Sequence, residues 1–225
     1  MKEYCRDQPL IAIHVPKTGG VSVKEVFKNW FGSDLYFNYY NEVSGEMPRK
    51  LALDEMDCKN TRSICIYGHF NKKRGFGTRD YYPKVDQFVT IVRDPFELAV
   101  SSYFYLHRVA ANWKDNSRRP ISDLKQYLLN DYVPNTLNHF PFDVTIDNYK
   151  DGIEKHFICM GITEEMDASI SCLAVKLGFS APDSIDFLNR SERNSFVPYE
   201  LRGQFKERWP LEYAVYEYAR ETLTR

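Results

Sequence analysis

The sequence predicts an α/β domain with a mainly parallel central sheet that is flanked by helices. Short apolar runs rich in branched residues alternate with segments whose apolar residues recur at helical spacing. Runs of this kind are typical of parallel strands covered on both faces, and their alternation with helices favours one layered sheet. A chain of 225 residues with 43% hydrophobic content can build one substantial core. We therefore expect a single domain over residues 1–225.

The first strand and the first helix are expected on either side of a glycine-containing loop. The apolar run Leu10–Val15 predicts the strand, and Pro16 ends it. After the loop at Lys17–Gly20, an apolar helical face is formed by Val23, Val26, Phe27, Trp30 and Phe31.

The rest of the chain repeats this alternation. Further strands are expected at Ser63–Tyr67, Phe88–Val92 and Phe157–Met160. Helices are expected over 96–106 with Asp94 as N-cap, over 122–130 with Ser122 as N-cap, over 163–177 ending at Gly178, and over 211–219. Residues 34–60 are expected to be irregular apart from a short helix over 50–56, and 112–120, 135–149 and 187–197 to be loops.

Composition limits the classes of partner and compartment. A net charge near -1 argues against a broad nucleic-acid surface, and no apolar run is long enough to span a membrane. No apolar signal core precedes the first strand, and none of the five cysteines stands in a C-x-x-C pair. We expect reduced thiols, no metal site and a cytoplasmic location; a lumenal catalytic domain trimmed of its anchor would have the same composition.

The Lys17–Gly20 loop has the features of an oxyanion-binding site. Glycines allow a ligand to approach the main chain, and the first N–H groups of a helix favour a phosphate or sulfate. Lys17 adds a charge, and Thr18 and Ser22 add hydroxyl groups. A plain turn with a solvated lysine is an equal alternative. A nucleotide-triphosphatase loop is disfavoured, because its lysine follows the last glycine, whereas Lys17 precedes both glycines.

Two further candidates also follow predicted strands. His69 comes after the second strand and Arg93 after the third, and in open α/β sheets ligands bind at the carboxyl ends of the strands. A structural histidine and a simple capped helix start are the alternatives for these positions. His14, His107, His139 and His156 have no comparable context, although His14 lies close to the loop. The basic residues Lys72, Lys73, Arg74 and Arg79 form either a solvated loop or a site for an anionic acceptor, with Arg108, Arg118 and Arg119 as weaker candidates.

Five segments together resemble the motifs of sulfotransferases that use 3′-phosphoadenosine 5′-phosphosulfate (PAPS). The resemblance is to the carbohydrate branch, typified by heparan sulfate 2-O-sulfotransferase. In chain order the segments are Val15–Ser22, Tyr67–Phe70, Ile91–Ser101, Met160–Glu164 and Asn189–Arg193.

This resemblance implies a P-loop-like, three-layer fold and a nucleotide-binding transferase. It implies that the phosphosulfate loop consists of Lys17, Thr18, Gly19, Gly20, Val21 and Ser22, with Val21 in place of a common hydroxyl residue. It assigns Arg93 and Ser101 to the 3′-phosphate, Arg193 to a loop that closes over the nucleotide, and His69 to the general base. Lys17 would also stabilise the leaving phosphate, and no metal is required.

The expected reaction is therefore sulfuryl transfer from PAPS to a hydroxyl group, with a sugar or polysaccharide as the favoured acceptor. Lys72, Lys73 and Arg74 would bind this acceptor if it is anionic. Two alternatives remain open: a nucleotide-dependent kinase or other phosphotransferase, and a nucleotide-binding module without catalysis. The sequence makes no prediction of oligomeric state.

Overall fold

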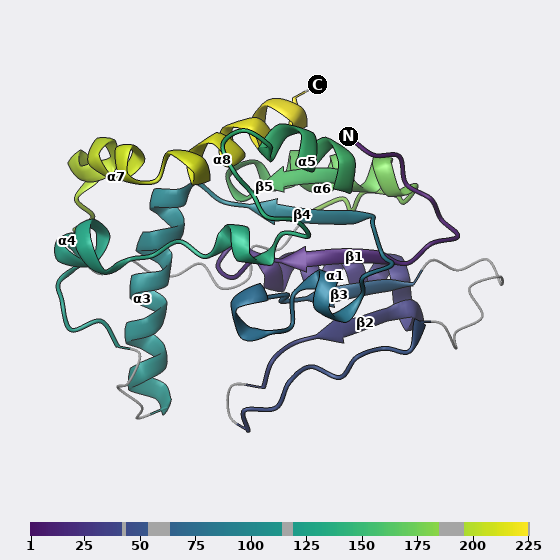
Figure 1. Cartoon of the computed structure of the whole chain (residues 1–225), viewed down its shortest axis with the longest axis horizontal. Helices are drawn as coiled ribbons and strands as arrows, with labels where there is room; N and C mark the ends of the chain where they lie inside the picture. Colours follow the sequence, from purple (N-terminus) through teal and green to yellow (C-terminus); the bar gives the residue numbers. More distant parts are fainter. Residues whose placement is uncertain (42–43, 54–63, 114–118, 185–195, 225) are drawn as a thin grey trace.

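The computed structural model describes residues 1–41, 44–53, 64–113, 119–184 and 196–224, and its centre is a five-stranded parallel sheet (Figure 1). The strands are β1 (Leu10–His14), β2 (Leu35–Asn38), β3 (Cys65–Gly68), β4 (Phe88–Val92) and β5 (Phe157–Ile162). Their order across the sheet is β2-β3-β1-β4-β5, and all four pairings are parallel. The predicted fold class is confirmed.

Helices cover both faces of this sheet. Their bounds are α1 (Gly20–Phe31), α2 (Thr78–Tyr81), α3 (Pro95–Trp113), α4 (Leu124–Gln126), α5 (Tyr149–His156), α6 (Met166–Leu177), α7 (Arg202–Arg208) and α8 (Pro210–Leu223). Helices α1 and α6 contribute to the hydrophobic cluster on one face, and α5 and α8 contribute to the cluster on the other. The molecule therefore has three layers, with the sheet in the middle and helices on both of its faces.

The two clusters follow from the alternation of side chains along each strand. In β1, Leu10 and Ala12 pack toward α1 and α6, whereas Ile11 and Ile13 pack toward α5 and α8. All four side chains are nearly or fully buried. This explains why β1, in the middle of the sheet, has four successive apolar residues instead of alternating apolar and polar ones.

A third cluster lies at the end of the sheet toward which the strands point. It joins α3, α4 and α7 through buried side chains such as Phe96, Leu124 and Phe205. In Figure 1 these helices lie on the left, beyond the tips of the strand arrows. The carboxyl ends of the strands therefore face α3.

Several predicted boundaries are confirmed. Asp94 caps α3, because its Oδ1 accepts a hydrogen bond of 3.0 Å from the Glu97 N–H. Gly178 ends α6 in the left-handed conformation, with φ of 75°. The terminal helix is present as α8, and it extends beyond the predicted bounds at both ends.

Other expectations were wrong. Residues 34–60 were expected to contain no strand, yet they contain β2, a four-residue edge strand whose mixed sequence has little apolar signal. Helices α5 and α7 were also missed, since each is short and mostly polar. The cap at α4 is Asp123, whose side chain accepts from the Gln126 N–H, and not Ser122. Part of the helix expected over 50–56 and most of the loop expected over 187–197 lie outside the described residues.

The described residues contain neither a membrane-spanning helix nor a cluster of metal ligands. Within that part of the chain, none of the helices has both the length and the hydropathy that a membrane crossing requires. The described side chains also form no group of three or more His, Cys, Asp or Glu that is placed to hold a metal ion.

Candidate functional site

The three predicted functional positions follow three adjacent strands and lie at one edge of the sheet. β1 pairs with β3 on one side and with β4 on the other. Ile13 is level with Gly68, and His14 is level with Ile91. Because the strands are parallel, the Lys17–Gly20 loop, His69 and Arg93 all leave the sheet at its carboxyl edge.

The loop after β1 turns through two left-handed residues. Lys17 has φ of 71° and Gly19 has φ of 80°, and Lys17 is the one non-glycine residue with positive φ in the described chain. Such a backbone is sparsely populated by side-chain-bearing residues and is typical of functional sites. The Thr18 hydroxyl donates to the Val15 carbonyl at 2.8 Å and so closes the turn.

Helix α1 begins directly at this turn. The Gly19 carbonyl accepts from the N–H groups of Ser22, at 3.1 Å, and Val23, at 3.3 Å. The N–H groups of Gly20 and Val21 precede these first helical bonds, at the positive end of the helix dipole. Val21 is 45% exposed and Ser22 is buried, so a ligand would reach the loop from the side of Val21.

Gly20 is required by close packing and not by its backbone angles. A Cβ atom at this position would lie 1.7 Å from Nε2 of His14, so the imidazole ring would have to move to make room for it. A Cβ on Gly19 would lie 2.7 Å from Cε of Met166, at the start of α6. The loop therefore rests on the His14 imidazole on one side and on α6 on the other.

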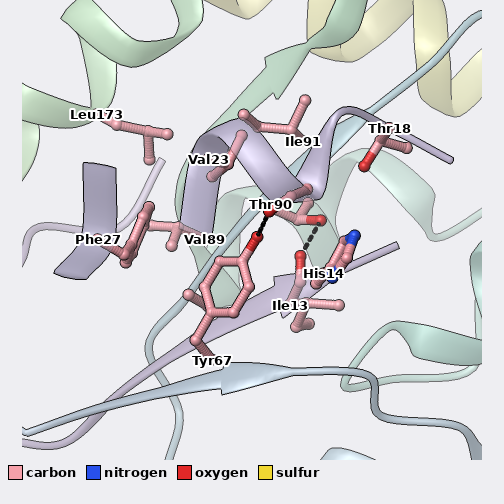
Figure 2. Close-up of a pocket in the computed structure, with 12 residues that line it drawn as sticks. Ile13, His14, Thr18, Val23, Phe27, Tyr67, Val89, Thr90, Ile91 and Leu173 are labelled. Carbon is pink, nitrogen blue, oxygen red and sulfur yellow. Dashed lines mark hydrogen bonds between the residues drawn. The ribbon is translucent and has the colours of Figure 1, made fainter. Parts of the chain in front are cut away.

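A small pocket beneath the loop shows how the sheet supports it (Figure 2). The Tyr67 hydroxyl donates to the Gly20 carbonyl at 2.8 Å, and the Thr90 hydroxyl donates to the Ile13 carbonyl at 2.9 Å. The remaining lining is largely apolar, with Val23 and Phe27 from α1. Side chains from β3 and β4 thus fix the backbone on both sides of the β1–α1 turn.

Positive charge collects around Lys17. Its ammonium lies 4.2 Å from the centre of the Tyr105 ring on α3. Burial, together with the nearby charges of Arg108 and Arg93, lowers the pKa of Lys17 to about 8. A bound anion would reverse this effect, because it would stabilise all three cations together. The site is therefore suited electrostatically to a phosphate or sulfate.

Arg93 joins the third strand to the loop. Its Nη1 donates to the Lys17 carbonyl at 3.0 Å, and its Nε lies 3.9 Å from Oε1 of Glu164. The same carboxylate oxygen accepts from the Asp94 N–H at 3.1 Å. The two anion-binding elements expected from the sequence are thus in direct contact, on the same side of the sheet.

A cleft extends from Arg93 along the start of α3. Two ion pairs border it, between Arg202 and Asp94 at 2.8 Å and between Arg202 and Glu97 at 2.7 Å. The Tyr216 hydroxyl of α8 donates to Oε2 of Glu164 at 3.2 Å. Elements far apart in sequence therefore form the wall beside Arg93.

His69 is oriented by backbone groups. Its Nδ1 lies 2.6 Å from the His14 carbonyl oxygen, which can only accept, so Nδ1 carries the proton. In the neutral ring Nε2 is then the unprotonated nitrogen, which can accept a proton from a hydroxyl. The His69 carbonyl in turn accepts from the Asn38 amide at 2.9 Å. Tautomer and ring direction therefore both suit a general base.

Two further histidines and a tyrosine surround this ring. The centre of the His69 ring lies 4.4 Å from that of His14, 4.9 Å from that of Tyr39 and 6.2 Å from that of His139. His14 Nδ1 lies 2.9 Å from the Tyr39 hydroxyl. Burial, reinforced by the other histidines, holds the pKa of His14 well below its ordinary value and lowers that of His139 to about 3. Both rings are neutral near pH 7.

Sequence reasoning found no role for His14 or His139. His14 could have been placed beside His69, since each follows a residue of the matched Ile13–Gly68 pair. His139 lies in a 3-10 helix, Thr136–His139, within a segment expected to be a loop. No sequence pattern marks its approach to His69.

No family model matches the chain, and no curated protein matches it. Among solved structures, it is similar to the crystal structure of the mouse sulfotransferase SULT7A1 complexed with PAP. The TM-score is 0.52 at 17% sequence identity, over 97% of this chain and 91% of that chain. The chain has a sulfotransferase fold. At this identity the likeness establishes the architecture alone.

Within this sulfotransferase fold, the remaining predicted residues have varied surroundings. Ser101 is buried on α3. Lys72 Nζ bonds to the Phe142 carbonyl at 3.0 Å and to Asp143 at 2.6 Å, and Lys73 is exposed. Arg74 lies 5.0 Å from the centre of the Tyr40 ring. Arg193 and Arg118 lie outside the described residues, so their roles stay predictions.

Proposed function

We propose that this chain is a sulfotransferase that moves a sulfuryl group from PAPS to an acceptor hydroxyl. The observation that carries the proposal is the meeting of three groups at one sheet edge: the Lys17–Gly20 loop, Arg93 bonded to that loop, and His69. The first two suit a ligand with more than one anionic group, and the third suits removal of a hydroxyl proton. The sulfotransferase fold supports the same reaction class.

The residues present fit the proposed co-substrate. The N–H groups at the start of α1 and the Lys17 ammonium would hold the 5′-phosphosulfate, and Arg93 and Ser101 would hold the 3′-phosphate. When bound, PAPS supplies the sulfuryl group and a phosphate as leaving group. The lowered pKa of Lys17 supports this assignment, because the crowded cations gain most from a highly charged ligand.

Each side chain then has a distinct chemical role. His69 Nε2 accepts the proton of the acceptor hydroxyl while Nδ1 stays bonded to the His14 carbonyl. Lys17 places its charge next to the phosphate bound in the loop and stabilises the negative charge that develops there. A positively charged imidazolium next to His69 would disfavour protonation of His69. Because His14 and His139 are neutral, His69 has no such neighbour in either of them.

A sugar or polysaccharide hydroxyl is the acceptor that we propose. The charge of Arg74 contributes to the lowered pKa of His139, so Arg74 lies within electrostatic reach of a ring that adjoins His69. Lys72 is engaged by Asp143, whereas Lys73 is exposed and could contact a ligand. An anionic glycan would therefore contact the exposed Lys73 before Lys72.

A labelled-sulfate transfer assay tests the proposal, with PAPS as donor and a panel of glycans, alcohols and phenols as acceptors. In the variant His69→Ala we expect kcat to fall by about 10²–10⁴. Affinity for PAP should stay within about twofold of the wild type, since His69 contacts the hydroxyl and not the nucleotide. His156→Ala provides a control histidine away from the loop. Transfer by His69→Ala at the wild-type rate would refute the role of the base.

A further inference from the structure

Two cysteines outside the candidate site lie in contact with each other. Cys159 is in β5 and Cys172 is in α6, and their Sγ atoms are 3.1 Å apart, with the Cys159 thiol donating to Cys172. A disulfide bond is about 2.05 Å long, so closure requires an approach of about 1 Å. Of the other described cysteines, Cys5 is exposed and Cys65 is buried.

The two thiols differ in accessibility. Cys159 is 1% exposed and belongs to the core between the sheet and α6. Cys172 is partly exposed, so it is the more accessible residue of the two. An oxidant would therefore react first at Cys172, and Cys159 would be the second partner.

They differ in acidity in the same direction. The hydrogen bond from Cys159 lowers the pKa of Cys172, and the Lys176 charge one turn along α6 lowers it as well. The same hydrogen bond and burial raise the pKa of Cys159. Because the thiolate is the nucleophile, Cys172 is the more reactive of the two near pH 7.

We propose that Cys159 and Cys172 form a reversible disulfide when the protein meets hydrogen peroxide. The Cys172 thiolate attacks one peroxide oxygen, the O–O bond breaks, and a sulfenic acid and hydroxide result; the hydroxide takes up the proton that Cys172 had released. Cys159 sulfur then attacks the sulfenic sulfur, the S–O bond breaks, and the departing hydroxide takes the Cys159 proton. Two thiols are oxidised and one peroxide is reduced to two waters.

The bond would join β5 covalently to the middle of α6. The first residue of this helix, Met166, lies against Gly19 of the Lys17–Gly20 loop. Oxidation would therefore restrain the helix that supports the loop from one side. The inference rests on the two thiols alone and does not depend on sulfuryl transfer.

The full-length protein tests this proposal directly. Both cysteines lie between Lys155 and Lys176 with no lysine or arginine between, so trypsin releases them in one peptide, His156–Lys176. After peroxide treatment and alkylation, we expect this peptide to be two hydrogens lighter and free of alkyl groups. Cleavage after Glu164 or Glu165 should leave its two halves linked until dithiothreitol separates them. Melting temperature should rise on oxidation and return on reduction.

Variants separate this pair from general thiol oxidation. Cys172→Ser and Cys159→Ser should each abolish the linked peptide, whereas Cys65→Ser and Cys5→Ser should retain it. The rate of linkage should fall as the pH is lowered, because the Cys172 thiolate becomes protonated. The proposal is wrong if peroxide leaves both cysteines alkylatable, if Cys172 links to another cysteine, or if it proceeds to sulfinic acid. Because the wild-type peptide map needs no variant, a variant that fails to fold does not prevent a decision.

Discussion

Lys17 combines a left-handed backbone, contact with the Tyr105 ring and two neighbouring arginine charges. Its pKa of about 8 makes its charge sensitive to pH in the range where the protein can be studied. Below this value the free protein presents an ammonium to the loop, and above it a neutral amine. Arginine would stay charged throughout.

Binding of PAP should therefore weaken above pH 8, by roughly tenfold for each further pH unit. In Lys17→Arg, the affinity should be nearly constant between pH 7 and 9.5. Isothermal titration calorimetry over this range measures both. If the wild-type affinity does not change with pH, Lys17 does not hold the anion.

His139 gives a second prediction at the residue scale, on stability. The pKa of His139 is about 3 in the folded protein and near 6.5 in the unfolded chain. Below pH 6.5, His139 therefore binds a proton in the unfolded chain but not in the folded protein. The free energy of unfolding should thus be greatest above pH 6.5 and fall with acid. From pH 6.5 to 4.5 the contribution of His139 to this fall is roughly 2–3 kcal/mol.

Urea unfolding at these two pH values measures the effect. His139→Gln keeps an N–H donor for the Asn135 side chain, which accepts at 3.0 Å in the wild type, but it does not titrate. We expect the variant to lose less stability in acid than the wild type. Parallel losses in the two proteins would show that His139 is protonated in the folded state.

At the scale of elements, the Lys17–Gly20 loop is held in place by side chains of the neighbouring strands. The Tyr67 and Thr90 hydroxyls fix carbonyls on either side of the turn, and the His14 ring packs against Gly20. The strand, loop and helix were all predictable, because apolar runs and glycines mark them. The packing of His14 under the start of the helix was not predictable, since it depends on the side-chain rotamer and on Tyr39, which follows β2.

Gly20→Ala tests this support. Its Cβ would overlap the His14 ring, so we expect a loss of about 1–3 kcal/mol in unfolding free energy and weaker PAP binding. Gly203→Ala is the matched control, because a Cβ there meets nothing within 4 Å and the residue is in helix α7. The double variant His14→Ala, Gly20→Ala should regain part of the stability. Equal melting temperatures for Gly20→Ala and the wild type would contradict the packing.

At the scale of the whole molecule, the sequence was sufficient to predict the class of sheet and to place the Lys17–Gly20 loop, His69 and Arg93 at one edge of it. Each of those positions follows a strongly apolar strand, and parallel strands end at one edge. The order of strands, the edge strand β2, and helices α5 and α7 depend on tertiary packing of weakly patterned segments. The approach of His139 to His69 likewise depends on the path of the folded chain and not on a local sequence pattern.

The acceptor prediction also concerns the whole molecule, since the basic residues and the base belong to different segments. For an anionic glycan, Arg74→Glu should raise KM by roughly tenfold and leave PAP affinity unchanged. Lys125→Glu, an exposed change on α4, is the control. A neutral acceptor should show no difference between the two variants. An anionic acceptor whose KM ignores Arg74→Glu would place its binding surface elsewhere.

The group that orients His69 is the main-chain oxygen of His14. A side-chain partner could be deleted by one codon change, but every amino acid at position 14 brings a carbonyl with it. The tautomer of the imidazole is thus protected from most point mutations and is lost only if the strand itself shifts. A substitution at position 14 would therefore change the side chain that packs against Gly20 but would leave the hydrogen bond that fixes Nε2 of His69 as the basic nitrogen.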